Sequence, residues 1–349
     1  MKRPAFILAW ETTQACSLGC LHCRASASLE RGKDELSVPE ISRVFQQATK
    51  IGKGIIIFSG GEPLLRNDLE EAVREAVSAG HNAAISTADG SLLSTERLDS
   101  LAKAGVSRFS FSIHFHEPRK HDEFTGRKGV LQSAIEAFNR IKTKKMEFQV
   151  NTTILPENYE DLEAMFRKII EWKASSWHLF FTVPTGRACG KENLRLSSDQ
   201  IEKILKWLAE MLAKGVEIPI KVTCAPQFSR ILTQRGVSEF KTRGRSCMAG
   251  NGFVFVSSTG DVKPCGYFNL IAGNVRKQPF DEIYLHSEVF ENLRNASLLE
   301  GKCGMCSYKE ICGGCRAKAY ATGSGIFGPD PDCLWSESIH ITQKVEDFS

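Results

Sequence analysis

Residues 54–59, Gly54-Ile-Ile-Ile-Phe-Ser59, form a short run that is apolar on both of its alternating faces. A β-strand of this kind is buried on both sides, as in a parallel sheet whose connecting helices cover it. Similar β-rich runs precede and follow it, with helical patterns between them. Together they make six predicted strands, the others being 5–10, 82–87, 107–113, 147–155 and 176–183. This alternation predicts repeated βα units.

The connections between these units extend the prediction to a fold. Right-handed crossovers curl a parallel sheet toward a barrel, and a closed TIM barrel needs eight βα units. Six units therefore predict an α/β fold, a partial (βα)6 TIM-like barrel that is open at one side. Two of the helices have start signals, Ser37 followed by Glu40 in the first turn, and Asn67 before the helix 69–77.

The pattern changes after about residue 190. One more helix is predicted at 197–212, and residues 254–264 form a predicted β-hairpin around Thr259-Gly260. From Cys247 onward the chain consists of short strands, glycine turns and cysteines. We therefore expect two domains, a core barrel at residues 1–222 and a cysteine-rich domain at residues 223–349.

The composition is that of a globular protein, since 42% of the 349 residues are hydrophobic and 25% are charged. The 45 basic and 41 acidic side chains leave a net charge of +4, which indicates neither a nucleic acid nor a membrane surface as a partner. No apolar run approaches the ~20 residues of a membrane span. The apolar residues 5–10, after the basic Met1-Lys2-Arg3-Pro4, are too few for a signal peptide. We expect a cytoplasmic protein.

Twelve cysteines are the most unusual feature of the composition. In a chain without an export signal, such a number indicates metal or redox chemistry rather than disulfides. Three lie in residues 16–23 and seven in residues 247–333, whereas Cys189 and Cys224 stand apart.

The first group, Cys16-Ser-Leu-Gly-Cys20-Leu-His-Cys23, directly follows the first predicted strand. It therefore lies at the C-terminal edge of the expected barrel, where such barrels carry their active sites. Three thiolates on one loop can hold a four-iron cluster and leave one iron open to a substrate or cofactor. The alternative is a structural zinc site, which needs a fourth nearby ligand. His22 lies within the motif but reaches the same ion only with difficulty.

The spacing of these cysteines resembles the signature of the radical S-adenosylmethionine (SAM) superfamily, in which an aromatic-type residue such as His22 precedes the third cysteine. The resemblance implies an enzyme with a 4Fe-4S cluster held by Cys16, Cys20 and Cys23. The open iron of this cluster binds the amino and carboxylate groups of SAM. An electron from the cluster then cleaves SAM to methionine and a 5′-deoxyadenosyl radical.

Other positions agree with this resemblance. Gly60-Gly61-Glu62-Pro63, at the end of the second predicted strand, is similar to the family's GGEP motif, whose backbone and carboxylate hold the methionine ammonium of SAM. An ordinary βα turn is the alternative. In relatives, residues at three further strand ends contact the SAM ribose or carboxylate. Their matches here are Thr87, Ser112 and Arg187, which ordinary strand-end polarity explains equally well.

The second group of cysteines resembles the SPASM extension of a subset of radical SAM enzymes, which holds auxiliary 4Fe-4S clusters. One departure is that two residues, rather than three, separate Cys312 from Cys315. The family's ligation scheme implies two auxiliary clusters. The first has four cysteine ligands, namely Cys303, Cys306, Cys312 and Cys333. The second has three, namely Cys247, Cys265 and Cys315. The eighth ligand is then Cys224, the substrate or another side chain. The alternatives are a single auxiliary cluster, or structural zinc at one four-cysteine group.

Several segments resemble the tetrapyrrole-modifying group of these enzymes, among them Trp10-Glu11-Thr12-Thr13, Thr223-Cys224-Ala225-Pro226 and Cys312-Gly-Gly-Cys315-Arg316-Ala317. That group includes the alternative heme synthase, which decarboxylates iron-coproporphyrin III, and enzymes of siroheme-derived and heme d1 pathways. The resemblance implies oxidative decarboxylation of tetrapyrrole propionates, with an electron donor such as ferredoxin or flavodoxin as partner. The alternatives are related tetrapyrrole side-chain removal, a SPASM peptide-modifying maturase and a non-enzymatic iron–sulfur scaffold.

A substrate with several carboxylates requires cationic side chains around it. The candidates are Arg24, Arg119, Arg127, Arg187 and Arg316, with a solvated surface position as the alternative for most of them. His114 and His116 share a face of the stretch that leaves the fourth predicted strand. Either is a candidate for binding the substrate iron or donating a proton, and a core or loop histidine is the alternative.

Overall fold

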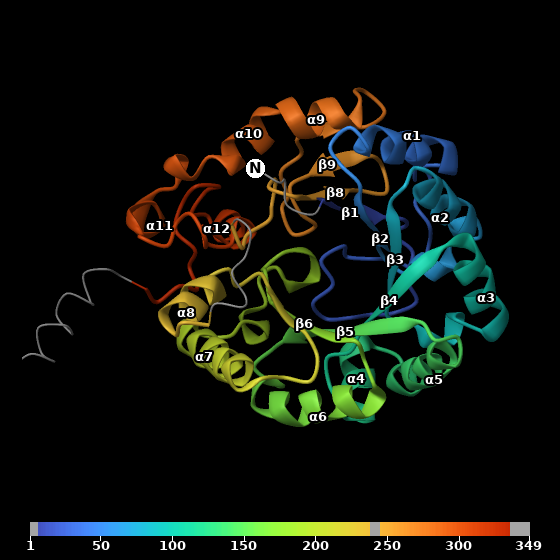
Figure 1. The fold of residues 1–349 in the computed structure, drawn as a ribbon, viewed down its shortest axis with the longest axis horizontal. Coiled ribbons are helices and arrows are strands. Elements are labelled where there is room, and N and C mark those ends of the chain that lie inside the picture. The colour runs from blue at the N-terminus through green and yellow to red at the C-terminus, as the bar shows by residue number, and fades with distance from the viewer. Residues whose placement is uncertain (1–5, 238–244, 336–349) are drawn as a thin grey trace, which may run out of the picture.

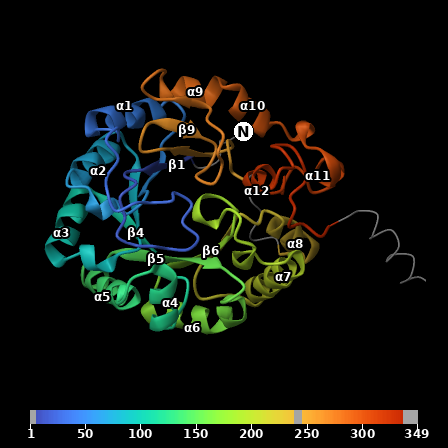
Figure 2. The same ribbon diagram turned by 180° about the vertical axis from the view of Figure 1, so that it is seen from behind.

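The computed structural model describes residues 6–237 and 245–335. One ten-stranded sheet forms its centre. The strands are arranged as a ring, and helices cover the outside of this ring (Figures 1 and 2). Residues 1–4 and Ala5, with which the first predicted strand was expected to begin, lie outside the described residues.

The six predicted strands are all present, and they are parallel neighbours in sequence order. They are β1 (Phe6–Glu11), β2 (Gly54–Ser59), β3 (Asn82–Thr87), β4 (Val106–Ser112), β5 (Glu147–Ile154) and β6 (Ser176–Phe181). The predicted α/β barrel is therefore confirmed.

Helices cover the outer surface of these strands: α1 (Val38–Ala48), α2 (Leu69–Ser78), α3 (Thr95–Ala104), α4 (Pro118–Thr125), α5 (Val130–Thr143), α6 (Leu162–Trp172) and α7 (Ser198–Lys214). Ser37 is the N-cap of α1 as predicted, and its amide donates to the Glu40 carboxylate at 2.8 Å. The prediction that Asn67 begins α2 is wrong. The N-cap is Asp68, whose carboxylate is held by the Arg66 guanidinium at 2.7 Å.

Two further parallel strands extend the sheet beyond these six. β7 (Ile220–Thr223) pairs with β6, and β8 (Phe253–Val256) pairs with β1. The predicted hairpin is confirmed, because β9 (Asp261–Lys263) runs antiparallel to β8, and β10 (Gly273–Asn274) follows beside β9. The strand order is β10-β9-β8-β1-β2-β3-β4-β5-β6-β7. Among the described residues the two end strands do not pair, so the barrel is partial.

The C-terminal part of the chain shares this sheet. Its helices are short, namely α8 (Phe228–Gln234), α9 (Phe280–His286), α10 (Glu288–Arg294), α11 (Gly301–Met305) and α12 (Arg316–Ala321). Helix α9 packs against α1 (Figure 1). Across residues 6–237 and 245–335, no helix has the length and apolar character of a membrane span. The proposed division at residue 222 falls within β7, and the second domain would contribute β8, β9 and β10 to the barrel sheet.

The main core lies between the strands and the helices. Trp10 of β1, Phe45 of α1 and Phe58 of β2 meet edge-to-face, with ring centroids 5.8 to 6.2 Å apart. On the opposite, inner face of β2, Ile55 is 37% exposed. The expectation that this strand is buried on both faces is therefore wrong for its inner face, because an open barrel does not fill its interior as a closed one does.

Candidate functional site

The predicted SAM-site residues come from several elements that end at one edge of the sheet. The cysteine loop follows β1 and Glu62 follows β2, Thr87 and Ser112 are the last residues of β3 and β4, and Arg187 follows β6. Because these strands are parallel, their C-terminal ends meet at the same edge. The dark-blue loop that follows β1 lies inside the ring of strands in both views (Figures 1 and 2).

Cys16, Cys20 and Cys23 lie on this loop, with their sulfurs close enough to influence one another. Burial is the main reason that the pKa of Cys16 rises to about 11 and that of Cys20 to about 12, and the neighbouring sulfurs contribute. Buried thiolates that repel one another need cations at close range. The irons of a 4Fe-4S cluster supply that charge, and thiolate sulfur is their usual ligand. The three residues therefore fit such a cluster.

A single metal ion is the alternative occupant of this loop. In the part of the chain that the structure describes, no three Cys, His, Asp or Glu side chains lie close enough together to bind one ion. A four-iron cluster binds each thiolate through a different iron, so it spaces the sulfurs more widely than zinc does. The His22 ring packs against His114 and Phe124, with centroids 4.5 and 4.9 Å away. Burial lowers the pKa of His22 to about 4, so this ring is neutral.

Gly60 and Gly61 bring the end of β2 against the start of the cysteine loop. A Cβ atom at Gly60 would lie 2.5 Å from the Thr13 carbonyl oxygen, and one at Gly61 would lie 2.2 Å from that of Ala15. The amides of Gly61 and Glu62 donate to these same two carbonyls at 2.7 Å. The close backbone approach expected from the Gly-Gly pair is thus an approach to the residues just before Cys16. Pro63 follows in a short 3₁₀ turn, Pro63–Leu65, and is buried.

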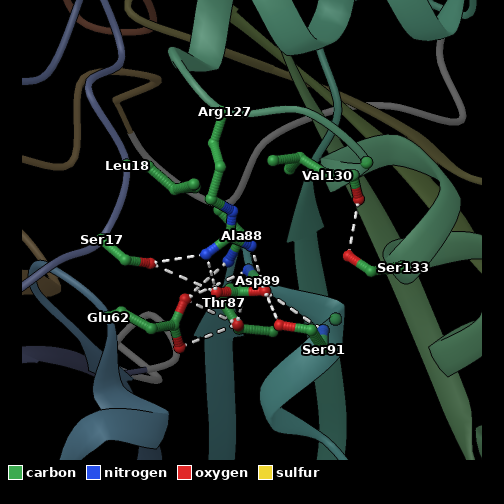
Figure 3. A network of polar contacts seen from close by, with 12 residues as sticks. Ser17, Leu18, Glu62, Thr87, Ala88, Asp89, Ser91, Arg127, Val130 and Ser133 are labelled. Carbon is green, nitrogen blue, oxygen red and sulfur yellow. Dashed lines mark hydrogen bonds and ion pairs between the residues drawn. The ribbon is translucent and has the colours of Figure 1, made fainter.

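The Glu62 carboxylate connects the ends of β2 and β3. It accepts hydrogen bonds from the Thr87 hydroxyl at 2.8 Å, from the Ala88 amide at 3.0 Å and from the Asp89 amide at 3.2 Å (Figure 3). Burial raises the pKa of Glu62 to about 7. The two strand ends are therefore fixed to each other by one buried carboxylate, and contact of Glu62 with a SAM ammonium stays a prediction.

An ion pair extends this network to the cysteine loop. Asp89 pairs with Arg127 at 2.6 Å, and the Arg127 guanidinium also donates to the Ser17 hydroxyl at 2.8 Å (Figure 3). Ser17 directly follows Cys16 in the chain. Arg127, a candidate for binding a substrate carboxylate, is thus engaged with Asp89 and positions the loop.

Arg187 supports the same loop from the other side. Its guanidinium donates to the carbonyl oxygens of Cys20 at 2.9 Å and Ala27 at 3.0 Å, and its amide donates to that of Cys23 at 2.9 Å. Its positive charge also lowers the pKa of Cys16 and Cys20, in opposition to burial. The sequence predicts that Arg187 contacts SAM. In the structure, the hydrogen bonds of Arg187 go to the backbone of the cysteine loop.

Arg187→Met should loosen this loop. Two backbone carbonyls then lose their donor, at a cost of about 1–3 kcal/mol. We expect a chelator to remove iron faster from the N-terminal cluster, whereas C-terminal iron is released at the wild-type rate. Arg187→Lys should restore part of the retention. Arg119→Met is the matched control, because Arg119 is 90% exposed and pairs with Glu123. Equal iron release from Arg187→Met and the wild type would contradict this role.

The other arginine candidates have different partners. Arg24 lies 3.6 Å from the Glu11 carboxylate and 4.6 Å from the centroid of the Phe255 ring. Arg316 is buried and donates to the carbonyls of Ile326 and Gly328. Of the five arginines, only Arg119 is a solvated surface residue, so the surface alternative fails for the other four.

His114 and His121 are buried near His22. Nδ1 of His114 accepts a hydrogen bond from the Thr153 amide at 3.1 Å. His114 and His121 lie with ring centroids 5.8 Å apart, and burial lowers the pKa of His121 to about 4. His116 and His114 line a small cavity beside α6. His114 is thus a buried core histidine with one ring nitrogen hydrogen-bonded. His121, which sequence reasoning assigned no role, completes the group around His22.

Four of the C-terminal cysteines line one cavity, as the ligation scheme predicts for the first auxiliary cluster. They are Cys303, Cys306, Cys312 and Cys333. Arg230 and Lys302 also line this cavity. Positive side chains beside four thiols reduce the repulsion between thiolates, so this set fits a 4Fe-4S cluster with four protein ligands.

The remaining three cysteines of that region form a separate group. Cys247 and Cys265 both lie within electrostatic range of Cys315 and of each other. Burial raises the pKa of Cys247 and of Cys265. The same donor chemistry as in the N-terminal loop therefore recurs here.

Comparison with known proteins agrees with these sites. The family model of the radical SAM superfamily matches residues 10–169, and that of the SPASM iron–sulfur cluster-binding domain matches residues 247–316. In the solved structure of Streptococcus suis SuiB bound to S-adenosylmethionine, the same fold recurs with a TM-score of 0.75 at 17% identity, over 95% of this chain and 77% of that one.

Two curated relatives are similar along nearly the whole chain. The AdoMet-dependent heme synthase of Methanosarcina barkeri is 40% identical over 94% of this chain and 96% of its own length. The protein of the same name from Nitratidesulfovibrio vulgaris is 36% identical over 94% and 92%, respectively. The protein is therefore an enzyme whose cofactors are SAM and 4Fe-4S clusters. It belongs to the radical SAM superfamily, as a SPASM-bearing member of the tetrapyrrole-modifying group.

Proposed function

We propose that the protein decarboxylates propionate side chains of iron-coproporphyrin III oxidatively and so produces heme b. The observation that carries this proposal is the 40% identity to an AdoMet-dependent heme synthase over 94% of the chain. The three-cysteine loop at the C-terminal edge of the barrel supports it, because SAM cleavage requires such a loop.

We further propose the ligands and contacts that this activity needs. Cys16, Cys20 and Cys23 hold the cluster that supplies a 5′-deoxyadenosyl radical from SAM. His22, Gly60, Gly61, Glu62, Pro63, Thr87, Ser112 and Arg187 form the SAM pocket. The two C-terminal cysteine sets hold auxiliary clusters. A ferredoxin or flavodoxin donates the electrons, and the reaction takes place in the cytoplasm.

The chain's own residues hold the reacting groups in place. Arg187 and Arg127 hold the cysteine loop, and the Glu62 carboxylate fixes the ends of β2 and β3 to each other. Arg24 directly follows Cys23 in the chain, its side chain is 19% exposed, and its contact with Glu11 is long at 3.6 Å, so it is the arginine that best suits a substrate propionate. The propionate loses a hydrogen atom from its β-carbon, then carbon dioxide and one electron, which leaves a vinyl group. Fixing one C–H bond beside the radical is most of the catalytic task.

The test is an anaerobic assay with SAM, dithionite and iron-coproporphyrin III. We expect 5′-deoxyadenosine and a porphyrin that is lighter by one carbon dioxide and two hydrogen atoms for each vinyl group formed. Mass spectrometry measures both products. Reactions without dithionite, or with heme b in place of the substrate, are the controls.

Two results would contradict the proposal. Cleavage of SAM without a change in the porphyrin would favour another tetrapyrrole or a peptide as the substrate. A reconstituted protein that leaves SAM intact would favour an iron–sulfur scaffold.

A further inference from the structure

We propose that Cys224 is the fourth protein ligand of the auxiliary cluster held by Cys247, Cys265 and Cys315. This inference rests on the cluster assignment made under the proposed function. It replaces the substrate, or another side chain, as the eighth ligand of the two auxiliary sites.

The sulfur contacts carry the argument. Cys224 packs against the small apolar core that contains Cys315, so the two sulfurs are near each other, and Cys224 also lies within electrostatic range of Cys265. Cys265 also interacts with Cys315 and with Cys247. Four sulfurs from four separate segments of the chain therefore converge on one place.

The Cys224 side chain lies in an apolar environment, as a ligand of a buried iron–sulfur cluster does, and not on the protein surface, where reactive thiols lie. Cys224 and Cys265 pack against a small apolar core that contains Val183, Phe268 and Cys315. The other auxiliary cavity has four cysteines of its own, so it does not require Cys224. In contrast, Cys189, the other cysteine outside the two groups, is exposed.

The backbone at Cys224 determines which substitution suits a test. Cys224 follows the last residue of β7 and has a φ of +64°, a left-handed conformation that side chains other than glycine rarely adopt. Glycine would adopt this backbone conformation without strain.

Cys224→Gly tests the inference on a backbone that glycine suits, since glycine adopts the left-handed conformation without strain. The wild type, reconstituted anaerobically, should bind about twelve irons per chain, four for each of three clusters. The variant should lose between about one and four of them, because a 4Fe-4S cluster without its fourth thiolate loses one iron or falls apart. Mössbauer spectra should show the change in one auxiliary cluster only. Cys224→Ser should keep more iron but shift the reduction potential of that cluster.

Cys189→Ala is the matched control and should leave the iron count and the spectra unchanged. Release of 5′-deoxyadenosine in the absence of substrate reports the N-terminal cluster separately, and Cys224→Gly should retain it. Full iron binding with wild-type spectra and potential in both Cys224 variants would overturn the inference alone. A wild-type count of about eight irons, with one auxiliary cluster, would overturn the assignment of two such clusters as well.

Discussion

Replacement of Cys16, Cys20 and Cys23 together by alanine should abolish SAM cleavage. SAM binds through an open iron, and without these three sulfurs no cluster remains at the C-terminal edge of the barrel to present one. We expect no 5′-deoxyadenosine above background and a loss of about four irons per chain. Iron analysis and quantitative chromatography of the SAM products measure both effects.

The reciprocal variant is the control. Cys303, Cys306 and Cys312 line the cavity of the first auxiliary cluster, and their joint replacement by alanine should also remove about four irons. That variant should still cleave SAM when dithionite supplies the electrons. Unchanged 5′-deoxyadenosine from the first variant would mean that the N-terminal loop does not hold the reactive cluster.

Gly61→Ala should reduce SAM cleavage by about a hundredfold, because a displacement of about 1 Å at a reacting group has an effect of this size. The added Cβ atom would lie 2.2 Å from the Ala15 carbonyl oxygen, which belongs to backbone rather than to a flexible side chain. The loop must move away, and Cys16 moves with it. Overpacking of this kind also destabilises the fold by about 1–3 kcal/mol. Initial rates of 5′-deoxyadenosine formation and thermal unfolding of the apoprotein measure the two effects.

Gly32→Ala is the matched glycine control. Gly32 lies in the same connection between β1 and α1, and its added Cβ would make an ordinary contact 3.5 Å from Cγ of Glu35. Wild-type rates are expected from it. If Gly61→Ala cleaved SAM as fast as Gly32→Ala does, the close approach of Gly61 to the cysteine loop would be irrelevant to the cluster.

The barrel could be predicted because its signals are local. Each of the six strands is a short β-rich run bounded by helical patterns, as in residues 54–59 and 82–87. Strand β7 has only four residues, Ile220–Thr223, and follows a proline. The pairing of β7 with β6 and of β8 with β1 joins segments that are far apart in the sequence. Local sequence patterns do not predict such pairing.

The cysteine groups could be predicted for the same reason, because their spacing is a pattern within short segments. The contacts that hold the cysteine loop and the strand ends in place could not be predicted. That Glu62 binds the end of β3, and that Arg187 binds carbonyls of the cysteine loop, depends on how separate strand ends meet. Cys224 remained one of several options in the sequence, and its contact with Cys315 is a tertiary feature.

The pairing of β1 with β8 has a consequence for biosynthesis. Ile7 lies opposite Phe253, so β1 waits during synthesis for a partner strand that is made about 250 residues later. At a translation speed of about 5–20 residues per second, this wait lasts on the order of ten seconds or more. Until then the peptide N–H and C=O groups on one edge of β1 have no strand partner. Such an edge can pair with strands of other nascent chains, which leads to aggregation. Overproduction at low temperature, or with chaperones, should therefore improve the yield of folded enzyme.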